Sequence, residues 1–325
     1  MRAENIVDEL AAAGLSRARA GEPMSKHTSW RVGGPADYFG VAETAESLRR
    51  AIAVAHSHGL GFLVLGGGSN ILVADSGIAG LVILNRIRSL NLEGDVNPSR
   101  LEAGAGVFFA RAALFSAKRG YSGLEWGIAI PGTVGASVVN NAGAHDGDVS
   151  RSLLETEALV DGKIVRLARK ELQFRYRESS LKQAQAPIQE TPVVITRCWF
   201  RVDRGQASES MDLITDLMEK RRRTQPIAEP SGGSTFKNPT GSSAGALIEQ
   251  AGLKGNRIGG AEFSSKHANF IVNRGTATAS DIVELMALAQ TKVRARFGLE
   301  LEPEVQLIGR WDPTEILWLV QRVGV

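Results

Sequence analysis

Two glycine-rich stretches constrain this chain more than any other feature of its sequence. The first glycine stretch is Gly66-Gly67-Gly68-Ser69-Asn70, and the second runs from Gly127 to Asp148 with almost no bulky polar side chain. Glycine lacks a Cβ and adopts positive φ, so successive N–H groups of such loops can approach one anion. The pair favours a large, buried, phosphate-bearing cofactor, although glycines can also serve only to turn the chain between strands. The absence of GxGxxG and GxxxxGK[ST] patterns argues against Rossmann and P-loop folds.

Length and composition are those of a soluble globular protein of two or three domains. The chain has 325 residues, of which 43% are hydrophobic and 22% charged. Its single cysteine, Cys198, lies in a strand-like run, which indicates a core residue and a reducing compartment. Acidic residues interrupt the N-terminal segment, and no apolar run is long enough to cross a bilayer. The sequence therefore predicts a cytoplasmic protein with no membrane partner.

Charged residues and histidines exclude some functions and leave others open. The formal net charge is +3, and the densest basic run, Lys220 to Arg223, is short and lacks interleaved aromatic residues. Nucleic-acid binding is therefore not expected. The run is consistent both with the solvated end of a helix and with a cleft that receives nucleotide phosphates. No spacing of Cys, His and Asp resembles a metal site, so the sequence predicts no bound metal.

Hydrophobic periodicity and end signals predict a mixed α and β chain. Helices are expected at residues 44–58, 107–119, 210–223, 242–251 and 281–297. Strands are expected at residues 62–65, 71–73, 81–84, 193–202 and 304–308, with a hairpin across 155–167 closed by Asp161-Gly162. Thr44 and Ser280 are expected to cap the first and last helices, and Gly298 to end the last one.

Three polar segments are candidates for chemistry. The loop from Gly232 to Pro239 carries Ser234 and Lys237 between glycines and a proline, where a side chain can reach a ligand. A serine proton donor would need nearby cations to lower its pKa, and Lys237 is a candidate. Taken alone, the octapeptide slightly favours a simple Ser/Thr turn before a helix. The planar guanidinium of Arg177 can bind a carboxylate through two parallel hydrogen bonds. The default alternative is a surface ion pair between Arg177 and Glu178. Glu304, taken alone, is a carboxylate at a strand edge.

Several ordered motifs run along nearly the full length of the chain: HTSWRVGGPA, VLGGGSNILV, IPGTVGASVVNNAGA, FRYRESSL, GGSTFKNP, AGALIEQAGLKG and LEPEVQLIG. Taken together, these motifs make the chain resemble the UDP-N-acetylenolpyruvoylglucosamine reductase (MurB) family. The resemblance implies an α+β fold: a two-lobed FAD-binding region of the vanillyl-alcohol-oxidase-like (PCMH-type) fold and a C-terminal α/β substrate-binding domain. The expected divisions are an N-terminal helical segment at 1–21, FAD-binding lobes at 22–86 and 87–207, a substrate-binding domain at 208–310 and a tail at 311–325.

The resemblance also implies the activity. NADPH reduces the FAD, and a hydride then passes to the enolpyruvyl group of UDP-N-acetylglucosamine enolpyruvate. The matching catalytic positions are Arg177 and Glu304, which hold and polarise the substrate carboxylate, and Ser234, which delivers a proton. Because two ionised carboxylates repel, Glu304 is expected to be paired with Arg177 or protonated. The expected assembly is a monomer or a weak homo-oligomer.

Cofactor and substrate contacts follow from the same match. The resemblance places backbone contacts to FAD at Leu65, Gly66, Gly67, Gly68, Ser69, Asn70, Ile71, Pro131, Gly132, Thr133, Gly135, Ala136, Asn141, Ala142 and Gly143. It places substrate contacts at Tyr176, Arg223, Lys237 and Asn238.

One departure separates this chain from the longer form of the family. Only 14 residues lie between Arg177 and the strand expected to open at Pro192, where the longer form inserts a tyrosine-bearing segment. The chain therefore resembles the short form, which leaves open how the site is capped. Two alternatives stay open: a flavoprotein oxidase or dehydrogenase of the same fold, and a non-catalytic nucleotide-sugar binding protein.

Overall fold

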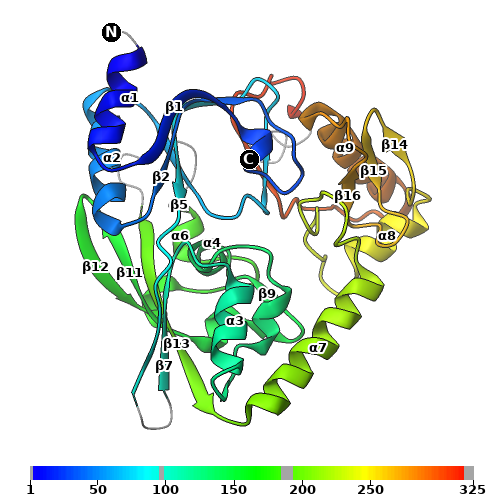
Figure 1. Ribbon diagram of the computed structural model, residues 1–325. Helices are drawn as coiled ribbons and strands as arrows, with labels where there is room; N and C mark the ends of the chain where they lie inside the picture. Colours follow the sequence, from blue (N-terminus) through cyan, green and yellow to red (C-terminus); the bar gives the residue numbers. More distant parts are fainter. Residues whose placement is uncertain (1–2, 95–98, 184–192, 318–325) are drawn as a thin grey trace. The chain divides into compact units, whose positions relative to one another are not determined.

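The chain forms two compact units, each assembled from segments that are not contiguous. The computed structural model describes residues 3–94, 99–183 and 193–317 (Figure 1). Unit 1 comprises residues 1–20, 38–67 and 80–220, and unit 2 comprises residues 21–37, 68–79 and 221–325. The expected division into consecutive segments stays a prediction, and the structure adds that 21–37 and 68–79 group with the C-terminal residues.

A six-stranded antiparallel sheet is the centre of unit 1. Its order is β12-β11-β13-β7-β6, with β8 paired to the end of β13. The strands are β6 (Leu90–Glu93), β7 (Ser99–Gly104), β8 (Tyr121–Ser122), β11 (Leu153–Val160), β12 (Lys163–Ala168) and β13 (Val194–Arg204). The β11–β12 hairpin turns at Asp161 and Gly162, with φ of 49° and 72°. These positive values confirm the expected type I′ turn.

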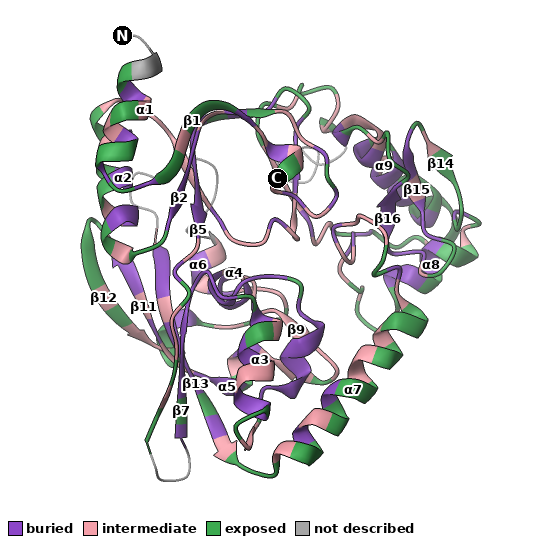
Figure 2. Ribbon diagram, viewed as in Figure 1, coloured by how far each residue is buried: buried purple, intermediate pink, exposed green. Residues whose placement is uncertain are grey.

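Helices pack their apolar residues against this sheet. They are α3 (Phe109–Ala117), α4 (Val134–Val139) and the short 3-10 helix η2 (Glu125–Ala129). The ring of Phe109 lies 4.9 Å from that of Trp126 and 5.4 Å from that of Phe200 in β13. Most of β13 is buried, as Figure 2 shows, because α4 and the aromatic cluster cover it. The second glycine stretch therefore runs through the core of unit 1.

Smaller elements complete this part of unit 1. They are the hairpin β9 (Gly143–Ala144) and β10 (Gly147–Asp148), the helices α5 (Val149–Ser152) and α6 (Ser180–Gln183), and the 3-10 helix η3 (Arg169–Leu172).

A second sheet has the order β1-β2-β5-β3. Its strands are β1 (Ser16–Pro23), β2 (Pro35–Ala42), β3 (Phe62–Leu65) and β5 (Ile78–Asn85), and its helices are α1 (Ala3–Ala12) and α2 (Ala45–Ser57). Thr44 caps α2 as expected: its side chain accepts a hydrogen bond from Ser47 N, and the Ser47 side chain accepts one from Thr44 N. Leu10, Leu48 and Leu81 belong to one buried cluster that joins the helices to the sheet within unit 1.

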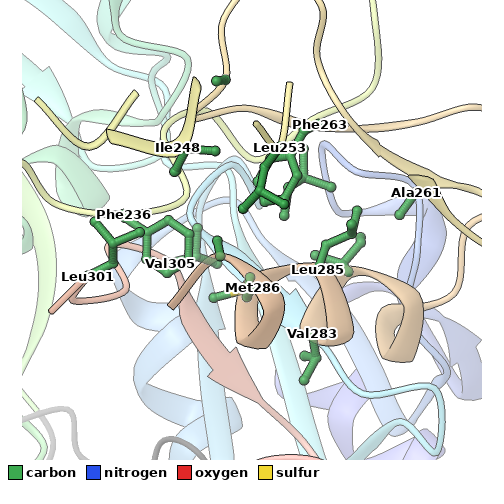
Figure 3. Close-up of a cluster of buried hydrophobic side chains, with 14 of the residues drawn as sticks. Phe236, Ile248, Leu253, Ala261, Phe263, Val283, Leu285, Met286, Leu301 and Val305 are labelled. Carbon is green, nitrogen blue, oxygen red and sulfur yellow. The ribbon is translucent and has the colours of Figure 1, made fainter. Parts of the chain in front are cut away.

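Unit 2 has its own core around one long helix. Its strands are β4 (Ile71–Val73), β14 (Arg257–Ile258), β15 (Ala261–Phe263), β16 (Ile271–Asn273) and β17 (Gln306–Ile308); its helices are η1 (Met24–Lys26), α8 (Ala244–Gln250) and α9 (Ala279–Phe297). Helix α7 (Ala207–Thr224) ends in this unit with Arg221–Arg223 in its last turn. Figure 3 shows Leu285 and Met286 of α9 turned toward this core, and β4 pairs in parallel with β17.

Two expected boundaries in unit 2 are wrong. Thr278, not Ser280, is the N-cap of α9, and it forms a capping box with Asp281. Ser280 lies inside the first turn, where its N–H and hydroxyl donate to the Asp75 carboxylate. The strand expected at 304–308 begins only at Gln306, because Glu304 N donates to Thr235 O instead of a strand partner. Gly298 ends α9 with φ of 64°, as expected.

Some expectations fall on residues that lie outside the described part of the chain. These are Pro192, where the strand observed as β13 was expected to open, and most of the tail, from residue 318 onward. Of the tail's described residues, Trp311 and Ile316 pack against the unit 2 core. Within the described ranges, no helix combines the length and apolarity that a membrane crossing requires.

The buried thiol of Cys198 yields a prediction about reactivity. The residue is fully buried in β13, 3.4 Å from Thr156 Oγ1, and burial raises the pKa of its thiol to about 12. Because the thiolate is the reactive form, we expect a thiol reagent to leave the native protein unlabelled near neutral pH. Mass spectrometry should find one label per chain after unfolding. Native labelling as fast as that of the unfolded chain would contradict this burial.

Candidate functional site

The first and second glycine stretches approach each other closely within unit 1. A Cβ atom at Gly66 would lie 2.3 Å from Thr133 Oγ1, and one at Gly67 would lie 3.3 Å from Pro131 O. Arg86 Nη1 donates to Gly66 O at 3.1 Å, which fixes the strand end that carries these glycines. The pKa of Arg86 is lowered by burial and by Arg88. The two stretches can therefore meet only because a hydrogen atom replaces a side chain.

Not every N–H group of the second glycine stretch can face a ligand. Val134 N donates to Val107 O at 2.8 Å, Gly135 N donates to Ala105 O at 3.0 Å, and Asn141 N donates to Val138 O at 3.2 Å. A Cβ at Gly135 would lie 2.8 Å from Ala105 Cβ. Gly135 and Asn141 therefore contribute close packing here, and their N–H groups are used inside the protein.

Two buried polar atoms beside this contact suit a ligand with polar edges. Among the residues described, Thr133 Oγ1 and Asn140 Oδ1 have no hydrogen-bond partner, and both are shielded from solvent. Asn140 Nδ2 donates to Ala136 O at 2.9 Å, so its amide orientation is fixed. Leaving such groups unbonded costs about 1–3 kcal/mol each. A flavin nucleotide carries donors and acceptors along its edges, so these residues fit it. Sequence reasoning missed Asn140, because it differs from Asn141 only in tertiary structure: the Asn141 amide is bonded on both sides, whereas Asn140 Oδ1 is unbonded.

The end of the first glycine stretch belongs to unit 2. Gly68 has φ of 64°, and a Cβ there would lie 2.0 Å from His27 O. Ser29 N donates to Gly68 O at 3.0 Å. Asn70 Nδ2 donates to Glu304 O at 3.3 Å, and Asn70 O accepts from Gln306 N at 3.1 Å. The stretch therefore leads directly to the segment that carries Glu304.

Ser234 and Glu304 lie on adjacent segments of unit 2. Glu304 N donates to Thr235 O at 2.9 Å, and Thr235 N donates to Asn269 O at 2.8 Å. Phe236 forms a bridge with Pro303. Figure 3 shows Phe236 beside Val305 in the buried cluster, so the residues following Ser234 and Glu304 share one core. Two residues far apart in sequence are thereby fixed next to each other.

Two of the three expected substrate-binding residues of unit 2 have partners of their own. Lys237 Nζ lies 2.6 Å from Glu302 Oε1, so Lys237 is a weaker candidate for activating Ser234. Asn238 Oδ1 accepts from Ala244 N at 3.0 Å and supports the start of α8. Arg223 is exposed in the last turn of α7. A cavity of about 360 Å³ lies nearby, lined by Arg222, Gln225, Pro226, Ile227, Ala228, Glu229 and Lys266.

Arg177 occupies an unfavourable backbone conformation beside the second glycine stretch. It lies in a turn whose end residues, Arg175 and Glu178, each donate a backbone N–H to the carbonyl oxygen of the other. The φ of Arg177 is 57°. The left-handed region costs a non-glycine residue about 1–2 kcal/mol. Arg177 Nη1 lies 3.2 Å from where a Cβ of Gly143 would be. A strained arginine against a segment expected to bind FAD favours a functional role for its side chain.

The structure groups Ser234 with Glu304 in unit 2 and holds Arg177 against Gly143 in unit 1. Tyr176 is 58% exposed, and Arg177 Cζ lies 5.4 Å from the centre of its ring. Whether Arg177 joins the other two residues, and whether it pairs with Glu304, stay predictions. In the part of the chain that is described, no three His, Cys, Asp or Glu residues are placed to hold a metal ion.

Comparisons with known proteins identify the family of this chain. Residues 36–168 match an FAD binding domain, and residues 225–308 match the C-terminal domain of UDP-N-acetylenolpyruvoylglucosamine reductase. The chain is 42% identical to UDP-N-acetylenolpyruvoylglucosamine reductase 2 of Symbiobacterium thermophilum, over 91% of this chain and 94% of that protein. It is 41% identical to the reductase of Rubrobacter xylanophilus, over 90% of this chain and 95% of that one.

A solved structure agrees as well. The reductase (MurB) from Thermus caldophilus superposes with a TM-score of 0.76 at 33% identity, covering 90% of this chain and 99% of that chain. Together with the FAD binding domain, this confirms the fold class expected from the sequence. The chain belongs to the UDP-N-acetylenolpyruvoylglucosamine reductase family.

Proposed function

We propose that this chain reduces UDP-N-acetylglucosamine enolpyruvate to UDP-N-acetylmuramate with NADPH and FAD, in cytoplasmic synthesis of peptidoglycan precursors. Family membership supports the proposal. Its main structural support is the backbone hydrogen bond from Glu304 N to Thr235 O, which joins the segment that follows Ser234, the expected proton donor, to the segment of Glu304.

The cofactor would be held by the close contact between the two glycine stretches. Gly66, Gly67 and Pro131–Thr133 would provide the surface for it in unit 1, and Thr133 Oγ1 a hydrogen bond. When bound, FAD supplies hydride chemistry: it is an acceptor for the hydride of NADPH and a donor toward the enolpyruvyl double bond.

The chain's own residues have three tasks in this reaction. Arg177 would bind the substrate carboxylate with two parallel hydrogen bonds and stabilise charge that develops on it. Glu304 would polarise that carboxylate while itself paired with a cation or protonated, since two ionised carboxylates repel. The Ser234 hydroxyl would donate a proton to the vinyl carbon next to the one that receives the hydride. One hydride and one proton together saturate the double bond.

Substrate recognition would extend from this centre toward the end of α7. Tyr176 is exposed beside Arg177, while Lys237, Asn238 and Arg223 would contact the UDP portion. Arg222 and Lys266 line the cavity beside Arg223, which gives the region the positive charge that a diphosphate requires. No nucleic-acid partner is proposed, and the expected monomer or weak homo-oligomer stays a prediction.

Stopped-flow spectroscopy tests the proposed function directly. The purified protein should carry a flavin spectrum that NADPH bleaches and that the enolpyruvyl UDP-sugar restores. A colourless protein that takes up no FAD would reject the proposal, as would a reduced flavin that the UDP-sugar fails to reoxidise.

Ser234→Ala should separate the two half-reactions. We expect flavin reduction by NADPH at the rate of the unchanged protein, because no proton from Ser234 is needed there. Reoxidation by the substrate should slow by about 10²-fold or more, since a positioned proton donor contributes a factor of that order. Ser242→Ala, eight positions further along before α8, is the control and should leave both rates unchanged. Normal product formation by Ser234→Ala would exclude Ser234 as the proton donor.

Glu304→Gln should also act on reoxidation alone. The substitution keeps the shape of the side chain and the backbone bonds to Thr235 and Asn70, but removes the ionisable group. We expect reoxidation to slow by about tenfold or more, with flavin reduction unaffected. Glu300→Gln, which removes the negative charge from an exposed ion pair with Arg294, is the control. Full substrate reduction by Glu304→Gln would eliminate the proposed role.

Gly68→Ala tests the first glycine stretch. The new Cβ would meet His27 O at 2.0 Å while φ is 64°, so the loop has to move. We expect less FAD per chain after purification, measured by absorbance. Gly59→Ala is a matched control, because Gly59 has φ of 63° but nothing within 4 Å of an added Cβ. Its strain should lower stability by about 1 kcal/mol without loss of FAD. Equal FAD content in both variants would contradict a cofactor contact at this loop.

A further inference from the structure

The turn that carries Arg177 is attached to the second glycine stretch by two side chains, one on each side of it. Asn141 Nδ2 donates to Arg175 O at 2.8 Å, and Ser179 Oγ donates to Val139 O at 2.6 Å. Val139 ends α4, the helix that directly follows Pro131–Thr133. All of these residues belong to unit 1.

Both the nitrogen and the oxygen of the Asn141 side-chain amide form hydrogen bonds. While Nδ2 donates to Arg175 O, Oδ1 accepts from Ser150 N at 3.0 Å. The residue has φ of 42°, a value that asparagine adopts more readily than most residues. The sequence placed Asn141 among the cofactor contacts, but its side chain bonds to the Arg177 turn and to the start of α5.

Ser179 holds the other side of the turn from a buried position. Its side chain is 3% exposed, and its hydroxyl bond to Val139 O is short. Between the two attachments, Arg175 N donates to Glu178 O at 3.0 Å and Glu178 N donates to Arg175 O at 3.1 Å. The strained φ of Arg177 is therefore maintained by bonds at both ends of the turn.

We propose that Asn141 and Ser179 are positioning residues for Arg177, an inference that rests on the proposed function. They join the Arg177 turn to the stretch expected to hold FAD, so that the guanidinium keeps a fixed place relative to that stretch. Hydride addition requires the substrate carboxylate and the reacting carbon to be oriented together, and a small displacement of one lowers the rate strongly. Gly143 completes the arrangement, because its missing side chain leaves room for Arg177 Nη1.

Two substitutions remove the attachments separately. Ser179→Ala deletes one hydroxyl, and Asn141→Asp removes the donor to Arg175 O while keeping an acceptor for Ser150 N and tolerance of positive φ. We expect each to slow flavin reoxidation by the enolpyruvyl UDP-sugar about three- to thirtyfold. Flavin reduction by NADPH should keep its rate, because Arg177 acts on the substrate. Ser180→Ala is the matched control: its hydroxyl donates to Glu171 O at 3.3 Å, away from the second glycine stretch.

A double-substitution test shows whether the effect passes through Arg177. In an Arg177→Ala background, adding Ser179→Ala or Asn141→Asp should slow single-turnover reoxidation no further. Effects that multiply with that of Arg177→Ala would overturn the positioning role while leaving the proposed function intact. Slower flavin reduction or lost FAD in both variants would likewise overturn it, since either result indicates a general structural role. Unchanged reoxidation in Arg177→Ala itself would reject both the catalytic role of Arg177 and this inference.

Discussion

A Cβ atom at Gly66 would lie 2.3 Å from Thr133 Oγ1, and the rest of the proposed site in unit 1 depends on this close approach. It joins the end of β3, a strand of the β1-β2-β5-β3 sheet, to the start of α4, a helix that packs against β13 of the other sheet. From α4, hydrogen bonds from Asn141 and Ser179 continue to the Arg177 turn. The absence of one side chain therefore governs both the surface expected to bind FAD and the position of an arginine more than one hundred residues away in sequence.

In unit 2, backbone hydrogen bonds hold two segments distant in sequence next to each other. The segments of Ser234 and Glu304 are connected through Thr235 O, and the neighbouring Phe236 and Val305 are buried in one cluster. A buried apolar cluster resists displacement more strongly than a surface loop does. The backbone that carries Ser234 and Glu304 is thereby held in place, as the proposed role of Ser234 in proton transfer would require.

Local sequence patterns predicted helix caps and turns correctly where a segment offered a single residue or pair suited to that position. Thr44 was recognised as a cap because it directly precedes an amphipathic run, and Asp161-Gly162 because the type I′ turn needs positive φ twice. The cap of α9 was misplaced because Thr278 and Ser280 both closely precede Asp281, and the Asp75 carboxylate that accepts from Ser280 N is a tertiary contact that the local pattern does not show. The roles of Arg177, Ser234 and Glu304 came from family motifs, since no local rule specifies them. Asn140 and the attachments by Asn141 and Ser179 depend on tertiary contacts that spacing does not encode.

The left-handed backbone conformation of Arg177 lowers the stability of the folded protein, while its guanidinium is proposed to be needed for activity. Glycine would adopt a φ of 57° without steric strain, so its introduction could stabilise the turn by up to about 1 kcal/mol. A laboratory evolution experiment that rewarded heat resistance alone would accordingly favour glycine there and discard the guanidinium. Persistence of arginine under such selection requires that growth of the host depend on the enzyme's turnover.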